Sequence, residues 1–399
     1  MQALLLRFGR CLGLLIAATA CARRPLAPPA ALVPRSAVLK PLPSVPVLPA
    51  VPGSAVAARP IGARTSAMPA PLARVYTPAE VTQDIYERAY AELNKMLDGR
   101  YPLSFKRAVF LTENAYLDNQ VQYENFCHLI SELVRDCRTV EEQSARYFLY
   151  DKADKAAVLK NAVLFRYLRD STRFSSGRVV APFRYNFDDF NGDADWRNMF
   201  VSKLLVSHTG NCHSLPFLYK IVAEETGAKA WLSLAPNHIY LKQHNEKDGW
   251  YNTELTSGTF PNDAWLMASG YVSRETIISG IYMDTLSARQ NVALCLVDLA
   301  KGYERKVGRV ASEAFVLQCT DLALRYFPTY INAHLLRAET LRQQFEQQTT
   351  RPEAQQAYAA MEAAYTRIFE TGYREMPPAM YAEWLQLVQR EKVKYQTTH

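Results

Sequence analysis

The stretch "HTGNCHSLPFLYKIVAEETGAKAWLSLAPNHIYL", residues 208–241, decides how this part of the chain folds. Its "GN" pair supplies a turn and an N-cap, and an apolar run with helical spacing follows until Gly227. We therefore expect a helix over residues 214–225, with Cys212 in its first turn.

Three short alternating runs follow that helix, at residues 229–234, 238–243 and 250–255. The segments "APN" and "HNEKDG" between them are typical of turns, so the runs predict an antiparallel meander. His238 opens the second predicted strand, and Glu254 lies on the third.

These positions predict a constellation of a nucleophile, a base and an acid. The start of a helix favours the thiolate form of Cys212, because the helix dipole and free N–H groups stabilise an anion. A strand that crosses this helix end would bring His238 to the sulfur as a general base, and Glu254 would orient the imidazole. Each residue alone has an ordinary explanation: a core cysteine, a hydrogen-bonding histidine, a surface glutamate. The three together predict a triad.

A cysteine at a helix start, followed by a histidine and an acid on consecutive strands, resembles the core of the transglutaminase-like superfamily, a papain-like cysteine fold. "GNCHSLPFLYKIVAEETGAKAWLSLAPNHIYL" is similar to that family's nucleophile helix and histidine strand, and "GWYNTELTSG" (249–258) to its acid-bearing strand. The likeness covers roughly residues 180–260. The family's acid is usually Asp, where this chain has Glu254. The likeness is greatest to bacterial members that join this core to tetratricopeptide-like helices.

The resemblance implies acyl transfer on a protein or peptide substrate through a thioester on Cys212. Three functions stay open: a cysteine peptidase or amidase, a catalytically inactive module that scaffolds other proteins, and an amine-transferring transglutaminase. Some relatives have lost the nucleophile and are thought not to be enzymes. A second oxyanion donor is expected upstream of the nucleophile, and the candidates are Trp196, Asn198, His208 and Asn211.

The segment "DDFNGDADW" (188–196) raises the question of a calcium site. Asp189, Asn191 and Asp193 match the first three ligand positions of an EF-hand loop. However, Ala194 stands where the loop needs glycine, and Phe200 stands where it needs a bidentate acid. We therefore predict an Asx-rich turn before a helix, with neither a metal nor a cofactor.

The first 20 residues are typical of an export signal. The apolar core "CLGLLIAATA" (11–20) follows two arginines and is too short to span a bilayer. The small residues before Cys21 resemble a bacterial lipobox, in which this cysteine is lipidated, although Ala18 stands where Leu is usual. We expect a lipid-anchored protein of the bacterial cell envelope, periplasm-facing or on the outer membrane; ordinary secretion and a mitochondrial transit peptide are the alternatives.

Residues 21–76 are predicted to form a disordered tether. Thirteen of the 22 prolines lie from Pro25 to Pro78, in a segment that cannot bury a core. Nine of the 46 Lys and Arg residues precede the first acid, Glu80, which leaves 37 basic against 39 acidic residues. The folded part is thus near neutral, which argues against nucleic-acid binding.

The remainder predicts an α+β fold in two parts: a helix-rich transglutaminase-like domain with a small antiparallel sheet over residues 77–282, and an all-α, tetratricopeptide-like region over 283–399. "TPAE" at Thr77 is a capping-box start. Helical patterns run from there to Gly99, and over 104–116, 122–135, 142–169 and 196–206. In the tail, Ala323, Pro328 and Ala338 have the spacing of a tetratricopeptide junction; a plain helical bundle is the alternative. These C-terminal helices are the candidate surface for a protein partner.

Overall fold

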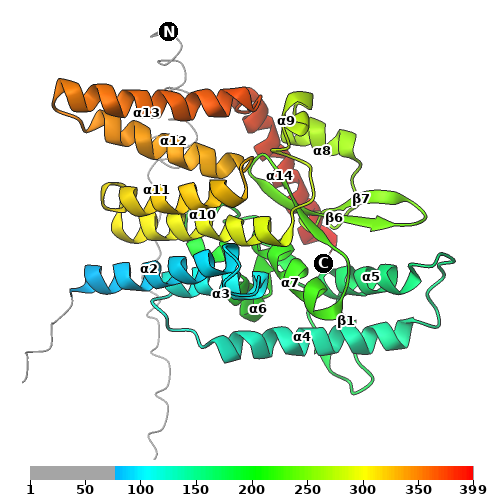
Figure 1. Ribbon diagram of the computed structural model, residues 1–399. Coiled ribbons are helices and arrows are strands. Elements are labelled where there is room, and N and C mark those ends of the chain that lie inside the picture. The colour runs from blue at the N-terminus through cyan, green and yellow to red at the C-terminus, as the bar shows by residue number, and fades with distance from the viewer. Residues whose placement is uncertain (1–76, 399) are drawn as a thin grey trace, which may run out of the picture. The chain divides into compact units, whose positions relative to one another are not determined.

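The computed structural model describes residues 77–398, and in this range the α+β prediction is confirmed (Figure 1). The helices are α2 (Pro78–Leu97), α3 (Phe105–Tyr116), α4 (Tyr123–Ser144), α5 (Lys155–Arg169), the 3-10 helix η1 (Trp196–Met199), α6 (Val201–Ser207), α7 (Ser214–Thr226), α8 (Asp263–Gly270), α9 (Arg274–Ile278), α10 (Ala288–Val307), α11 (Arg309–Tyr326), α12 (Ile331–Glu346), α13 (Arg351–Glu370) and α14 (Pro378–Thr398). Among these described helices, none combines the length and the apolarity needed to cross a membrane.

The strands form three small sheets. β1 (Thr172–Arg173) pairs with β2 (Val179–Val180), and β3 (Arg184–Tyr185) pairs in parallel with β4 (Thr209–Gly210). β5 (Trp231–Ala235), β6 (His238–Asn245) and β7 (Gly249–Thr253) form the predicted antiparallel meander in the order β5-β6-β7. The longer strands lie within two residues of their predicted bounds, because alternation and turn residues both specify them.

The first helix begins as its sequence predicts. The Thr77 side chain accepts a hydrogen bond from the Glu80 N–H, and the Glu80 carboxylate accepts one from the Thr77 N–H. This reciprocal cap satisfies two N–H groups that a helix start would otherwise leave unpaired.

The predicted helix over 142–169 is wrong in its first half. α4 continues to Ser144, and α5 begins only at Lys155. Between them the chain is held by the β6–β7 turn: the Glu246 N–H donates to the Asp154 carboxylate at 3.0 Å, and the Ala153 N–H donates to the Glu246 carboxylate at 3.2 Å. These long-range bonds replace the local helical ladder, and helical periodicity cannot reveal them.

Helix α7 lies at the centre of the fold. Its buried side chains come from all around the helix, and it packs against α4, α5, α6, β5 and β6. An amphipathic surface helix would have one polar face, whereas α7 is apolar over most of its circumference. The residues before α7 are therefore held on every side by other elements.

The helices after residue 282 are continuous with the preceding fold. The Met283 and Leu286 N–H groups donate to the Leu234 and Leu232 carbonyls, both at 2.9 Å, so this segment runs along β5. α10 then packs against α2, α3 and α11 (Figure 1). By its contacts, the chain from Thr77 onward is one compact unit.

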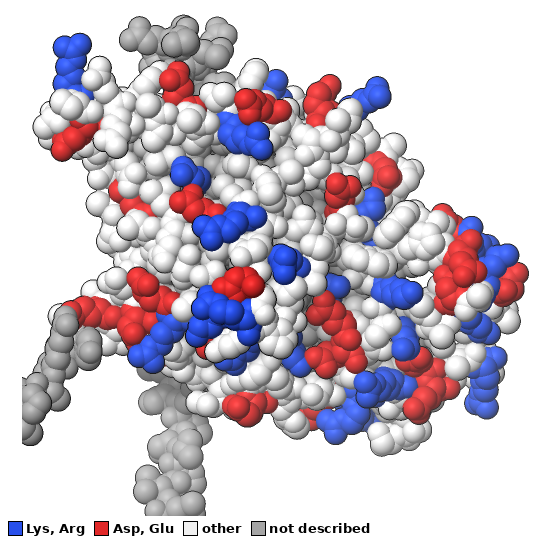
Figure 2. Space-filling view, in the orientation of Figure 1, with Lys and Arg blue, Asp and Glu red and all other residues white. Residues whose placement is uncertain are grey.

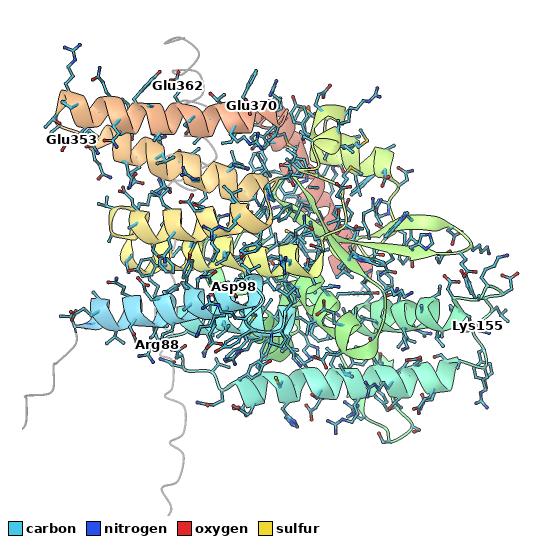
Figure 3. All side chains as sticks on the ribbon, in the orientation of Figure 1. Arg88, Asp98, Lys155, Glu353, Glu362 and Glu370 are labelled. Carbon is cyan, nitrogen blue, oxygen red and sulfur yellow. The ribbon has the colours of Figure 1, made fainter. Side chains whose placement is uncertain are left out.

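Small residues allow close packing in the C-terminal helices. Ala323 on α11 and Ala338 on α12 are fully buried where these two helices meet. α12 and α13 pack as a further pair, and Glu353, Glu362 and Glu370 follow one another along α13 (Figure 3). On the face drawn in Figure 2, acidic and basic side chains are interspersed, and neither sign forms a continuous patch.

The packing of α10 predicts the effect of ending the chain early. A chain that stops at Tyr282 lacks α10 and exposes the apolar surfaces of α2, α3 and β5, so we expect no cooperative thermal transition and strong binding of a hydrophobic dye. A chain that stops at Gly372, which lacks only α14, serves as the control and should unfold cooperatively. Cooperative unfolding of the shorter chain would contradict this view of α10.

Candidate functional site

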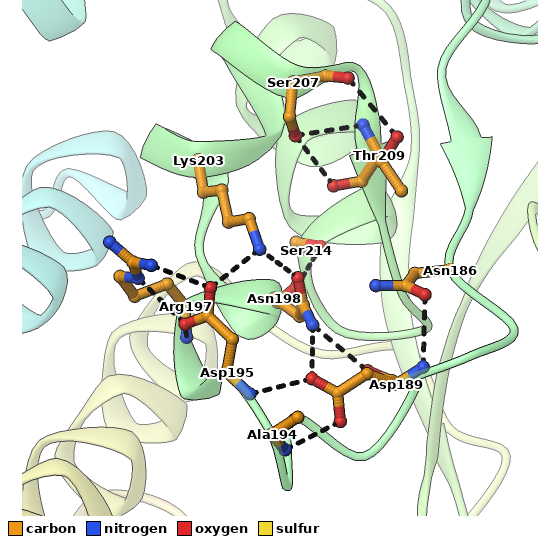
Figure 4. A network of polar contacts seen from close by, with 10 residues as sticks. All are labelled: Asn186, Asp189, Ala194, Asp195, Arg197, Asn198, Lys203, Ser207, Thr209 and Ser214. Atoms are coloured by element: carbon orange, nitrogen blue, oxygen red, sulfur yellow. Dashed lines mark hydrogen bonds and ion pairs between the residues drawn. The ribbon is translucent and has the colours of Figure 1, made fainter. Parts of the chain in front are cut away.

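A closed turn precedes the nucleophile segment (Figure 4). The Asn186 side chain accepts hydrogen bonds from the Asp188 and Asp189 N–H groups, both at 3.1 Å. The Asp189 carboxylate accepts from the Ala194 N–H at 3.0 Å and the Asp195 N–H at 2.9 Å. This is an Asx-rich turn of the kind its sequence predicts. Throughout residues 77–398, no cluster of three or more His, Cys, Asp or Glu side chains has an arrangement that could hold a metal ion.

A reciprocal cap fixes the start of the nucleophile helix. The Asn211 side-chain oxygen accepts from the His213 and Ser214 N–H groups at 3.0 and 3.1 Å, and Ser214 Oγ accepts from the Asn211 N–H at 3.0 Å. Asn211 and Ser214 are both fully buried. A Cβ on Gly210 would lie 2.4 Å from Ser214 Oγ, so only glycine fits there. Cys212 lies in this turn, two residues before α7 begins, so the prediction that it lies in the first turn of the helix is wrong. The bonds of Asn211 and Ser214 close a turn that precedes α7.

The structure brings Cys212, His238 and Glu254 together. His238 opens β6, as predicted, and its Nε2 lies 2.5 Å from Glu254 Oε2. The other ring nitrogen is not used by Glu254, and the charges of Cys212 and His238 act on each other. Cys212 Sγ also lies 4.0 Å from the Asn237 carbonyl oxygen. The imidazole is thus placed between the sulfur and the carboxylate.

Glu254 lies one residue past β7, where its backbone pairs with that of Thr259. Only 5% of its surface is exposed, and its second carboxylate oxygen accepts a 2.8 Å hydrogen bond from the Thr256 N–H. Both oxygens therefore have donors. The longer glutamate side chain reaches the imidazole from a position just beyond the strand end.

The electrostatics of the three groups favour an ion pair. Burial opposes ionisation of the thiol, but the hydrogen bond and charge of His238 outweigh burial and hold the pKa of Cys212 below its usual range. Burial likewise opposes protonation of His238, yet the charge of Glu254 and the bonds to both partners raise its pKa well above its usual value. The pKa of Glu254 is lowered, because the charge of His238 overcomes the cost of burial. These opposite shifts favour a thiolate beside an imidazolium, with Glu254 as the partner carboxylate.

Tyr185 is a site residue that the sequence did not reveal. It lies on β3 directly opposite Gly210 in the parallel pair, and its hydroxyl interacts electrostatically with the Cys212 side chain. Burial, followed by the charge of Cys212, raises the pKa of Tyr185 well above its usual value, so the phenol keeps its proton. The phenol also lies within reach of the Cys212 backbone N–H. A sequence signal is lacking because a two-residue parallel strand has no detectable periodicity.

Asn198 and Asn211 use their side-chain amides elsewhere. The Asn211 Nδ2 donates to the Phe190 carbonyl at 2.8 Å. The Asn198 Nδ2 donates to Asp189 at 2.6 Å, and its oxygen accepts from Lys203 (Figure 4). Both residues therefore hold the turn and the cap that support Cys212.

Trp196 and His208 also have other neighbours. The Trp196 ring lies under the Arg305 guanidinium, 4.1 Å from its central carbon. The His208 ring stacks on Phe183 with centroids 4.2 Å apart, and its Nδ1 lies 3.0 Å from the Ala181 carbonyl oxygen. The described hydrogen bonds connect neither residue to Cys212. The predicted lipidation site Cys21, the signal sequence and the tether lie outside the described residues.

Comparison with models of protein families, with curated proteins and with solved structures gave no match to this chain.

The site predicts how the thiol reacts as pH changes. Iodoacetamide alkylation of Cys212, followed by mass spectrometry, should become half-maximal at a lower pH than alkylation of Cys127, which is also partly exposed. His238→Ala removes the positive partner, so the half-maximal pH for Cys212 should rise by at least about one unit. Equal profiles for the wild type and His238→Ala would rule out the ion pair.

Proposed function

We propose that this chain is a transglutaminase-like cysteine hydrolase that cleaves amide bonds of a protein or peptide through a Cys212–His238–Glu254 triad. The observation that carries the proposal is the position of the His238 ring, which lies 2.5 Å from the Glu254 carboxylate and interacts electrostatically with the Cys212 thiol. A histidine that served only to stabilise the strand would not need a thiol of lowered pKa beside it. The same order of nucleophile helix, histidine strand and acid supports membership of the transglutaminase-like superfamily.

In the proposed reaction, the Cys212 thiolate attacks the amide carbonyl carbon. The carbonyl π electrons move to oxygen and give a tetrahedral oxyanion. The His238 imidazolium then protonates the leaving amine as the C–N bond breaks, which leaves a thioester on Cys212 and a neutral imidazole. Neutral His238 next removes a proton from water, which attacks the thioester and releases the acid and the thiolate. Glu254 holds the ring orientation and stabilises the imidazolium throughout.

Tyr185 supplies the second oxyanion donor in this proposal. Its hydroxyl keeps its proton and lies beside both the Cys212 sulfur and the Cys212 backbone N–H. A carbonyl oxygen that enters between the phenol and this N–H would meet two donors. Such donors stabilise charge that develops only in the transition state, which is why they accelerate the chemical step.

The location and partners of the enzyme follow from the sequence. We propose that the lipid on Cys21 and the proline-rich tether hold the domain at the bacterial envelope, and that the tetratricopeptide-like helices offer a surface for a protein partner. The buried small residues Ala323 and Ala338 at the α11–α12 contact support the repeat-like packing.

Substitution of Tyr185 tests its role as a donor. We expect Tyr185→Phe to lower kcat by roughly 100-fold, the usual cost of losing one oxyanion donor, with little change in alkylation of Cys212. Tyr251→Phe, the same change on β7, is the matched control. A higher kcat for Tyr185→Phe than for the wild type would mean instead that the Tyr185 phenol blocks the site.

Two substrates separate the candidate functions. A quenched fluorescent protein substrate should be hydrolysed by the wild type, and His238→Ala should reduce the rate by roughly 10²–10⁴-fold. Cys212→Ala should abolish it. A glutamine peptide offered with a labelled primary amine should be hydrolysed without incorporation of the labelled amine. Incorporation would indicate an amine transferase, and inactivity toward both substrates despite a reactive thiol would favour the scaffold.

A further inference from the structure

A second histidine lies next to the nucleophile. His213 follows Cys212 directly and precedes the first residue of α7. Its Nδ1 lies 2.9 Å from the Met199 carbonyl oxygen, and its Nε2 lies 3.0 Å from the Asp298 carboxylate. The ring also packs on Phe217, with centroids 4.1 Å apart. This histidine takes no part in the triad.

The two partners of the ring define its charge. A backbone carbonyl and a carboxylate both accept hydrogen bonds, so each ring nitrogen must carry a hydrogen. A neutral ring would place a nitrogen lone pair against one of the two acceptors. The geometry therefore requires an imidazolium. Burial lowers the pKa of His213, but the charge and hydrogen bond of Asp298 outweigh burial, so the pKa lies above its usual value.

The surroundings of His213 connect the nucleophile turn to two other helices. Asp298 lies on α10, 85 positions away in sequence. A small cavity of about 20 Å³ beside the ring is lined by Glu113 of α3 and by Cys295 of α10, among other residues. The titratable groups around His213 are thus Cys212, Glu113, Cys295 and Asp298. Burial raises the pKa of Cys295 well above its usual value, so this thiol stays neutral.

Glu113 has donors of its own. Its two carboxylate oxygens accept from the Val201 N–H at 2.6 Å and the Ser202 N–H at 2.8 Å, at the start of α6. Burial raises the pKa of Glu113 to about 7 in spite of these bonds. Asp298 is therefore the direct counter-ion of His213, and Glu113 is the more distant one.

We propose that His213 is a positioning residue: a partly buried imidazolium, bound to α10 through Asp298, that fixes the turn of Cys212 and stabilises the Cys212 thiolate. This inference rests on the proposed function. The Cys212 thiolate interacts with the His238 imidazolium. A second imidazolium, that of His213, belongs to the next residue of the chain. The Cys212 charge in turn raises the pKa of His213, as the reciprocity of two coupled groups requires. It follows that α10, which supplies Asp298, is part of the catalytic apparatus.

The charge of His213 can be read directly in the wild-type chain. With ¹⁵N-labelled histidine, NMR at pH 7 should show both ring nitrogens of His213 protonated, with the signal assigned by its loss in His213→Gln. Carboxamidomethylation of Cys212 removes the thiolate, so it should lower the pH at which His213 titrates. A neutral ring at pH 7, or a titration unaffected by alkylation, would overturn the inference in the wild-type chain itself.

Variants test the effect on the thiol. In His213→Gln, the pH of half-maximal Cys212 alkylation should rise by about one unit, because the positive member of the His213–Asp298 pair is lost while the carboxylate remains. His334→Gln is the matched control, because His334 bonds a carbonyl, at 2.8 Å, far along the chain from Cys212. If the folded His213→Gln variant shows the same pH profile of Cys212 alkylation as the wild type, the inference about His213 is overturned, while the proposed triad is not. If Cys212 reacts no faster in the wild type than in His238→Ala, the triad is refuted instead. The NMR experiment would still report the charge of His213 in that case.

Discussion

The reciprocal cap between Asn211 and Ser214 is the constraint on which the site depends. It satisfies the N–H groups of 211, 213 and 214 within four residues, and it holds Cys212 in the one turn between β4 and α7. Gly210 allows this cap, since any Cβ there would displace Ser214 Oγ. The cap is in turn anchored from outside, because the Asn211 amide donates to the Phe190 carbonyl. Cys212 is therefore held by hydrogen bonds that involve the buried Asn211 and Ser214, which is the preorganisation that the proposed catalysis would require.

Such a site carries a cost in solvation. Cys212, His238, Glu254 and His213 bring two positive and two negative charges into a poorly solvated region. Isolated charges would be unstable there, but each has an opposite charge as its immediate partner, and Asp298 completes the set. Removal of any one member leaves its partner unpaired, which costs more than the pair itself contributes. The expectation that single variants alter the charge state of their neighbours follows from this coupling.

The parts of the fold and the site that were predictable are those with a local signature. The glycine and asparagine before Cys212, the turn before His238 and the alternation around Glu254 each act within a few residues, so the helix, the meander and the three triad positions could be read from the sequence. Tyr185 and Asp298 could not, because a two-residue strand and a helix 85 positions away are set by tertiary packing alone. The break between α4 and α5 was missed for the same reason: bonds to the β6–β7 turn override helical periodicity.

Two side chains of α10 connect this helix to the residues around Cys212. Asp298 and Arg305 both project from α10, one turning toward His213 and the other covering Trp196 on η1. α10 therefore contacts the chain on both sides of Cys212, at Trp196 and at His213, from two points about two helical turns apart. A partner that bound the neighbouring helices α11–α13 and displaced α10 relative to these contacts would disturb Asp298 and change the charge balance at Cys212. Binding on the C-terminal helices and ionisation of the thiol would then be coupled through an ion pair.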